Sequence, residues 1–129
     1  MYRYGRRSTE RLKTAHPDLQ EVFNEAIKYM DITILEGHRD EDKQNRYFAE
    51  GKSKVKFPNG KHNRVPSEAI DAAPYPINWK DREAFYFMAG LLMGIGIQKG
   101  IFLRWGGDWD RDGNFKDNEF DDLSHIEMI

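Results

Sequence analysis

Apolar side chains recur at helical spacing in two stretches of the chain. The first stretch places them at i, i+3, i+4, i+7, i+8 and i+11, one continuous stripe made of Leu19, Val22, Phe23, Ala26, Ile27 and Met30. Pro17 precedes this stripe, at a helical position where its missing N–H costs nothing. A second stripe runs through residues 80–98, with Asn78 as its expected N-cap. The pattern predicts two amphipathic helices.

Shorter apolar and β-branched runs predict strands at 32–35, 67–72, 101–105 and 125–129. Residues 41–50 are typical of a short helix that ends at Gly51, and the polar, proline-containing segment 52–67 is typical of a loop. Helices and strands thus alternate along the chain, with two loops. This order predicts an α+β fold, a small and mostly antiparallel sheet with flanking helices.

Composition narrows the class of protein. The chain has 129 residues, 20 Lys+Arg against 22 Asp+Glu, and no Cys. We expect one domain spanning 1–129, no nucleic-acid partner at this near-neutral charge, and a monomer. No apolar run approaches the roughly 20 residues of a membrane span, and the start of the chain lacks the apolar region of a secretory signal. Without Cys, a transition-metal site must use histidine and carboxylates.

Residues 108–119, D-W-D-R-D-G-N-F-K-D-N-E, match the EF-hand calcium loop at its defining positions. Gly113 stands where that loop turns sharply. The preceding residues are typical of a strand rather than a helix, so we expect an EF-hand-like loop carried by another fold. The alternative is a solvated acidic turn. The expected Ca²⁺ ligands are Asp108, Asp110, Asp112, the backbone carbonyl of Asn114, and Glu119.

A second set of residues has the composition of a zinc site. His62 ends a polar loop, Asp71 lies inside an apolar strand, and His125 opens the last strand. A carboxylate buried in such a strand is costly unless it is paired or metal-bound. Two imidazoles and one carboxylate, with a water in the fourth position, are typical of catalytic zinc, and Asp122 could act as the general base. Spacing alone leaves open a loop histidine and an unrelated strand-end carboxylate.

The segments around these residues resemble the zinc peptidases that cleave bacterial cell-wall peptides. G-K-H-N-R-V-P-S-E-A-I-D-A-A-P-Y resembles their first metal motif, and D-L-S-H-I-E resembles the second. G-H-R-D-E-D-K-Q-N and W-G-G-D-W resemble an upstream element and the turn before the second motif. The family includes D-Ala-D-Ala carboxypeptidases and dipeptidases and phage L-alanyl-D-glutamate endolysins. The acidic loop resembles the calcium-regulated endolysin branch, and the implied fold is the D-Ala-D-Ala carboxypeptidase/hedgehog-like one.

The resemblance implies roles for individual residues. Asp122 would be the catalytic base, Arg39 the cation near the scissile carbonyl, and Gln44 a residue of the substrate pocket. Two departures stand out: Gly60 replaces the family's usual Ser, and the spacer between the first two zinc ligands is longer than usual. Ser67 could supply the missing hydroxyl, to the substrate or to the loop. The implied Zn²⁺ ligands are His62, Asp71 and His125.

The function implied is hydrolysis of the L-alanyl-D-glutamate bond in the stem peptide of peptidoglycan, with Zn²⁺ and Ca²⁺ as cofactors and calcium as regulator. Such an endolysin would be made in the host cytoplasm and act on the cell wall after release. Two alternatives stay open. One is a D,D-carboxypeptidase or dipeptidase of the same family, and the other is a non-catalytic calcium-binding module that interacts with the wall.

Overall fold

The structure is a computed structural model that describes residues 1–114 and 121–129. Four strands form one sheet in the order β1-β2-β4-β3, and every neighbouring pair is antiparallel. The strands are β1 (Ile32–Glu36), β2 (Ala69–Pro74), β3 (Leu103–Gly106) and β4 (Asp122–Met128). The helices are α1 (Arg6–Leu12), α2 (Pro17–Ala26), α3 (Glu41–Ala49) and α4 (Arg82–Lys99), with a 3-10 turn, η1 (Lys61–Asn63). The predicted α+β class is confirmed.

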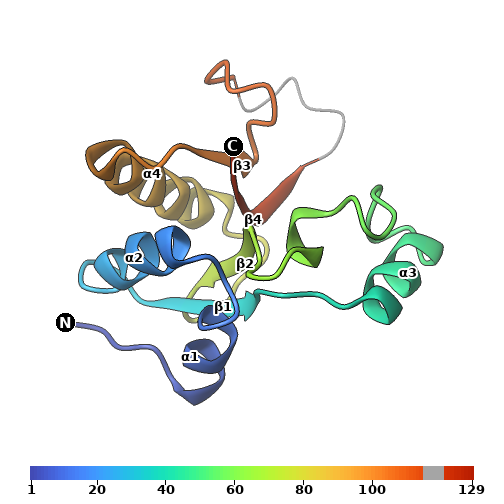
Figure 1. The fold of residues 1–129 in the computed structure, drawn as a ribbon. Helices are drawn as coiled ribbons and strands as arrows, with labels where there is room; N and C mark the ends of the chain where they lie inside the picture. The colour runs from blue at the N-terminus through green and yellow to red at the C-terminus, as the bar shows by residue number, and fades with distance from the viewer. Residues whose placement is uncertain (115–120) are drawn as a thin grey trace.

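The helices are distributed unevenly around this sheet (Figure 1). Helix α4 packs on β2, β3 and β4, α2 packs on α4, and α1 packs on β1. Helix α3 stands apart from these layers, joined to the sheet by extended segments (Figure 1). The apolar stripes of α2 and α4 meet the sheet in one core. Its fully buried members include Leu19, Phe23, Ile34, Ile70, Phe85, Leu92 and Ile126.

Element boundaries differ from the sequence prediction where local hydrogen bonds intervene. Helix α1 was not predicted, because among its seven residues only Ser8 and Leu12 are buried. The prediction that Asn78 caps helix α4 is wrong. The Asn78 side chain accepts a bond from the N–H of Lys80 in a local turn, and the N-cap of α4 is Asp81, which accepts from the N–H of Ala84.

The strands differ from prediction at their ends. Strand β2 starts at Ala69, since Ser67 instead forms an isolated bridge with Ala15. Strand β4 starts at Asp122, three residues earlier than expected, because this residue pairs with Gly106 of β3. A Cβ on Gly106 would lie 2.0 Å from the carbonyl oxygen of Asp122, so only glycine permits this approach.

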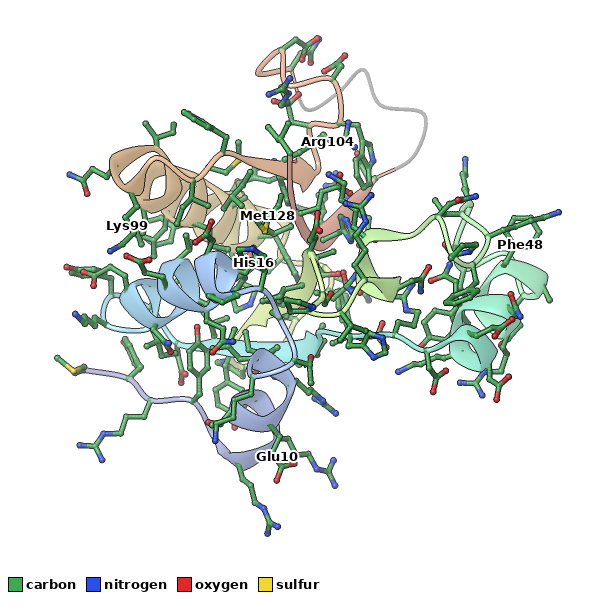
Figure 2. All side chains as sticks on the ribbon, viewed as in Figure 1. Glu10, His16, Phe48, Lys99, Arg104 and Met128 are labelled. Carbon is green, nitrogen blue, oxygen red and sulfur yellow. The ribbon has the colours of Figure 1, made fainter. Side chains whose placement is uncertain are left out.

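Charged side chains cover the outside of the helices. Figure 2 shows Glu10 projecting from α1 and Lys99 at the end of α4. Lys99 pairs with Glu21 at 3.1 Å and so links α4 to α2. Within the described part of the chain, none of the helices combines the length and hydropathy needed to cross a membrane.

Candidate metal centre

Three predicted zinc ligands come together at the middle of the sheet. Asp71 on β2 and His125 on β4 are register partners, so their side chains leave the sheet on the same face. The neighbouring Ile70 and Ile126 are fully buried in the core, as strand alternation requires. His62 reaches the centre from η1, in the segment that the sequence indicated only as a loop.

The ligand atoms form a nearly equilateral triangle. His62 Nε2 lies 3.3 Å from Asp71 Oδ1 and 3.3 Å from His125 Nδ1, and the third side, from His125 Nδ1 to Asp71 Oδ1, is 3.2 Å. A tetrahedral zinc ion with bonds of about 2.0–2.1 Å would separate its ligand atoms by about 3.3 Å. The triangle therefore has the size of three zinc ligands that leave one position open.

The outer nitrogen of each imidazole has a hydrogen-bond acceptor. His62 Nδ1 donates to the carbonyl oxygen of Gly37 at 2.7 Å, and His125 Nε2 donates to Glu127 Oε1 at 2.9 Å. In neutral rings these bonds leave a lone pair on both inner nitrogens, facing the carboxylate of Asp71. Three acceptor atoms this close repel one another unless a cation, either a proton or a metal ion, lies among them. The donor set therefore fits a divalent metal ion, with an outer shell of the usual kind.

The pKa values of the residues in the centre also indicate that a positive charge is favoured there. Burial raises the pKa of Asp71, but the imidazoles of His62 and His125 outweigh it and hold this pKa below its usual range. Burial lowers the pKa of His125, yet its bonds to Asp71 and Glu127 raise it to about 9. Burial also opposes ionisation of Glu127, but His125 and Arg104 lower its pKa to about 2. The centre thus favours a carboxylate next to a cation.

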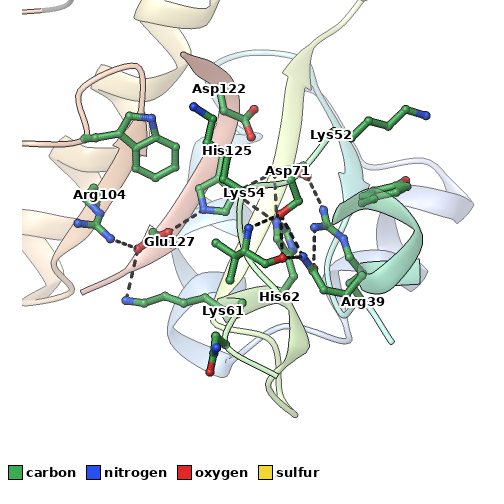
Figure 3. Close-up of a pocket in the computed structure, with 17 residues that line it drawn as sticks. Arg39, Lys52, Lys54, Lys61, His62, Asp71, Arg104, Asp122, His125 and Glu127 are labelled. Carbon is green, nitrogen blue, oxygen red and sulfur yellow. Dashed lines mark hydrogen bonds and ion pairs between the residues drawn. The ribbon is translucent and has the colours of Figure 1, made fainter. Parts of the chain in front are cut away.

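The triangle lies in the wall of a cavity of about 430 Å³ (Figure 3). Asp122, the expected base, lines this cavity although it stands an odd number of residues from His125. The register shift beside Gly106 breaks strict alternation at this point. Burial and the negative charge of Asp71 raise the pKa of Asp122, and its Oδ1 accepts a bond from the Ser124 hydroxyl at 3.0 Å.

Arg39 and Gln44 also line the cavity and are bonded to each other. Arg39 Nε donates to Glu36 Oε1 at 2.7 Å, Nη1 donates to Gln44 Oε1 at 3.0 Å, and Nη2 lies 3.4 Å from Asp71 Oδ2. The Gln44 side chain is 1% exposed, and its amide nitrogen donates to the carbonyl of Val55 at 2.6 Å. Gln44 is thus placed to hold Arg39 beside the ligand triangle, with little of its own surface toward the cavity.

Ser67 lies outside the cavity, whereas Gly60 lines it. The Ser67 hydroxyl is fully buried outside the cavity lining and donates to the carbonyls of Gly37 and Ala69, at 3.2 and 2.7 Å. This position offers no direct contact to a substrate, and it supports the carbonyl that His62 uses. A Cβ on Gly60 would lie 2.7 Å from Asn63 Oδ1, so the usual Ser would displace a packed side chain.

The acidic loop gathers its carboxylates in a second cluster. Ligand atoms of Asp108, Asp110 and Asp112 all lie within 4.8 Å of one another. Asp108 is buried, and its Oδ2 accepts a bond from the N–H of Gly113 at 2.9 Å. Gly113 has φ of 79°, the sharp turn that the motif requires. Asn114 N–H donates to Asp112 Oδ1 at 2.8 Å. Glu119 lies outside the described residues.

Sequence reasoning passed over several residues of the site. Glu127 bonds His125 through Oε1, while its Oε2 lies 2.7 Å from Arg104 Nη2 and 3.4 Å from Lys61 Nζ (Figure 3). Glu127 stands in the D-L-S-H-I-E motif without a role assigned to it, although the H-x-E spacing could have indicated one, because residues two apart in a strand share a face. Trp109, at 5.4 Å between ring centroids from His125, likewise stands in the W-G-G-D-W motif without an assigned role.

The cavity combines two histidines and an aspartate with a further aspartate and an arginine, which are residue types that metal-dependent hydrolases use. The fold is that of a solved structure, the L-Ala D-Glu endopeptidase ChiX of Serratia marcescens, with a TM-score of 0.78. The two chains are 23% identical, and the match covers 98% of this chain and 90% of that one.

Sequence comparison identifies the family. The profile of the family described as phage L-alanyl-D-glutamate peptidase matches residues 1–129, so the chain belongs to this family. The L-alanyl-D-glutamate peptidase of Escherichia phage T5 is 33% identical over 136 residues, which span 99% of this chain and 98% of that protein. The expected family is therefore confirmed.

Proposed function

We propose that the protein is a zinc-dependent peptidase that hydrolyses the L-alanyl-D-glutamate bond in the stem peptide of peptidoglycan. Membership of the family supports the bond and the substrate. The observation that carries the metal dependence is the triangle of acceptor atoms, with sides of 3.2 to 3.3 Å. It suits a small divalent cation held by His62, Asp71 and His125.

Zinc in this position would supply Lewis acidity, which polarises a carbonyl group and makes water acidic near neutral pH. The protein contributes rigidity. Both imidazoles are held by bonds to Gly37 and Glu127, and Asp71 is paired with Arg39. Because these partners exist before any substrate arrives, the ligands need little rearrangement to bind the ion.

Asp122 is the proposed general base. It takes a proton from the attacking water and returns it to the amine of the leaving D-glutamate. Burial and the charge of Asp71 raise its pKa, which makes the carboxylate a stronger base. Arg39 is the proposed partner of the negative charge that develops on the scissile carbonyl oxygen. Loss of one such donor typically reduces the rate by about 10²–10³.

Calcium regulation is the second part of the proposal. Three carboxylates converge in the acidic loop, and Gly113 has the backbone conformation of the motif. We assign Asp108, Asp110, Asp112, the carbonyl of Asn114, and Glu119 as ligands. Calcium is scarce inside a host cell and plentiful outside it. The loop would therefore keep the enzyme weakly active in the cytoplasm and activate it at the wall after release.

Digestion of purified peptidoglycan tests the enzymatic proposal. Mass spectrometry of the fragments, with and without a chelator, should show stems with a free N-terminal D-glutamate only when zinc is present. Release of D-alanine would instead indicate the D,D-specific alternative. Absence of any cleavage with zinc and calcium both supplied would contradict the proposal and favour a wall-binding module.

A further inference from the structure

Trp109 stands between the acidic loop and the metal centre. Its indole lies 5.4 Å from the imidazole of His125, centroid to centroid, with the rings tilted by 40°. The indole also neighbours Arg104, whose guanidinium carbon lies 5.7 Å from the indole centroid. All three residues line the cavity. The indole is thus part of the wall that His125 presents to a ligand.

These contacts close a ring around His125. Arg104 and Glu127 are register partners on β3 and β4, and Arg104 Nη2 lies 2.7 Å from Glu127 Oε2. The other oxygen of Glu127 holds His125 Nε2 at 2.9 Å. The imidazole is therefore held at its outer nitrogen by Glu127 and covered on its ring by Trp109. Arg104 neighbours both Glu127 and Trp109, and it therefore connects the two side chains that hold His125.

The loop dictates where the indole points. Alternate residues of the loop, Asp108, Asp110 and Asp112, turn their carboxylates toward one another. Trp109 lies between the first two in the chain, and its indole packs against His125. A change in the loop backbone that alters the spacing of the carboxylates would therefore also move the residue that carries this indole.

We propose that Trp109 is a positioning residue that links the acidic loop to the metal centre by holding His125, with Arg104 and Glu127, in the orientation of a metal ligand. The proposal rests on the zinc and calcium sites of the proposed function and names the contact between them. In this proposal, the calcium loop acts on the metal centre through the side chain of Trp109, which contacts the ligand His125. This route is additional to the short stretch of chain that joins Glu119 to Asp122.

The test compares zinc affinity in four full-length proteins, by competition with a chromophoric chelator, each with and without calcium. They are the wild type, Trp109→Ala, Trp109→Phe and the control Trp79→Ala. Trp79 is an exposed indole that stacks on Phe85 at 5.4 Å and lies outside the cavity lining. Circular dichroism verifies that each variant is folded, and the absorption spectrum of the cobalt-loaded proteins reports ligand geometry.

We expect Trp109→Ala to weaken zinc binding by about 10-fold and to alter the cobalt spectrum, as is typical when support of a ligand is removed. Trp109→Phe should restore most of the affinity because it keeps an aromatic face on His125. Calcium should tighten zinc binding to the wild type and leave the affinity of Trp109→Ala unchanged, although both proteins bind calcium.

Several results would overturn the proposal. One is a Trp109→Ala protein that matches the wild type in zinc affinity and in its response to calcium. Another is an equal loss in the Trp79→Ala control, which would indicate general destabilisation. A wild type that binds zinc without any response to calcium would refute the link and leave the peptidase intact. A wild type without zinc affinity would refute the proposed metallopeptidase itself, along with this inference.

Discussion

The metal centre and the acidic loop each gather three possible ligands, but they do so by different means. In the centre the ligands come from η1, β2 and β4, and their side chains are only 5%, 17% and 12% exposed. In the loop the three carboxylates lie within five consecutive residues, and Asp110 and Asp112 are exposed. The loop carboxylates accept bonds from the loop's own N–H groups, at Asp112, Gly113 and Asn114.

This difference separates a site that is preorganised from one that is locally assembled. The centre is held by strand register and by outer hydrogen bonds, so its geometry persists as long as the fold does. The loop depends on short-range turns, which cost little to rearrange. The difference supports the proposal of a permanent catalytic ion in the centre and of a regulatory ion, bound and released with its concentration, in the loop.

Removal of a ligand at the centre should have the largest effect. We expect His125→Ala to lose stoichiometric zinc and at least about 10³-fold in stem-peptide hydrolysis, because the ion supplies several kcal/mol of transition-state stabilisation. Metal analysis and a peptide-cleavage assay measure both. The control His38→Ala removes an exposed imidazole outside this cavity and should leave both unchanged. Equal activity in the two variants would contradict the assignment of the centre.

Asp122→Asn should have the second-largest effect, because it removes the proposed base and leaves the ligand triangle intact. We expect kcat to fall by about 10²–10⁴ while zinc stays bound. The adjacent Asp121 offers a matched control, because it forms an exposed ion pair with Arg82 at 2.6 Å. Asp121→Asn should change kcat little. A larger loss in Asp121→Asn than in Asp122→Asn would transfer the role of base to Asp121.

The loop should show a smaller, conditional effect. Asp108→Asn combined with Asp112→Asn removes two charges and retains side chains of the same shape. We expect activity at saturating calcium to fall by about 10-fold, toward the calcium-free activity of the wild type, as for a typical coupling free energy. Calcium titration of hydrolysis measures this. The control pair outside the loop, Asp18→Asn with Asp42→Asn, changes a half-buried and an exposed acid and should keep the response. Full, calcium-insensitive activity of the loop variant would refute regulation.

Gly60→Ser should have the smallest effect, and on stability rather than chemistry. Its Cβ would meet Asn63 Oδ1 at 2.7 Å, the atom that accepts the N–H of Gly60. Losing this bond should lower the free energy of unfolding by about 1 kcal/mol, which thermal denaturation can measure. Asn63 also donates to Gln44 Oε1 at 3.2 Å. Unchanged stability with higher activity would instead indicate that a serine at this position serves the substrate.

Sequence reasoning succeeded where local pattern and chemistry coincide. The stripes of α2 and α4, the strand around Asp71 and the three converging loop aspartates follow from periodicity and spacing. It failed where a tertiary contact decides, as with the short charged helix α1 and the start of β4 at Asp122. The buried position of Ser67 is of the same kind, because it results from a bridge to Ala15 and from hydroxyl bonds to the carbonyls of Gly37 and Ala69.

By itself, the sequence determined the α+β class, the family motifs and the residue types that could bind metal, because these depend on composition and on spacing along the chain. Only the tertiary structure decided that three distant side chains meet in a triangle of 3.2 to 3.3 Å. It alone placed Glu127, Arg104 and Trp109 around His125. The physical reason is that register between strands, and the approach permitted by Gly106, set distances that no local pattern encodes.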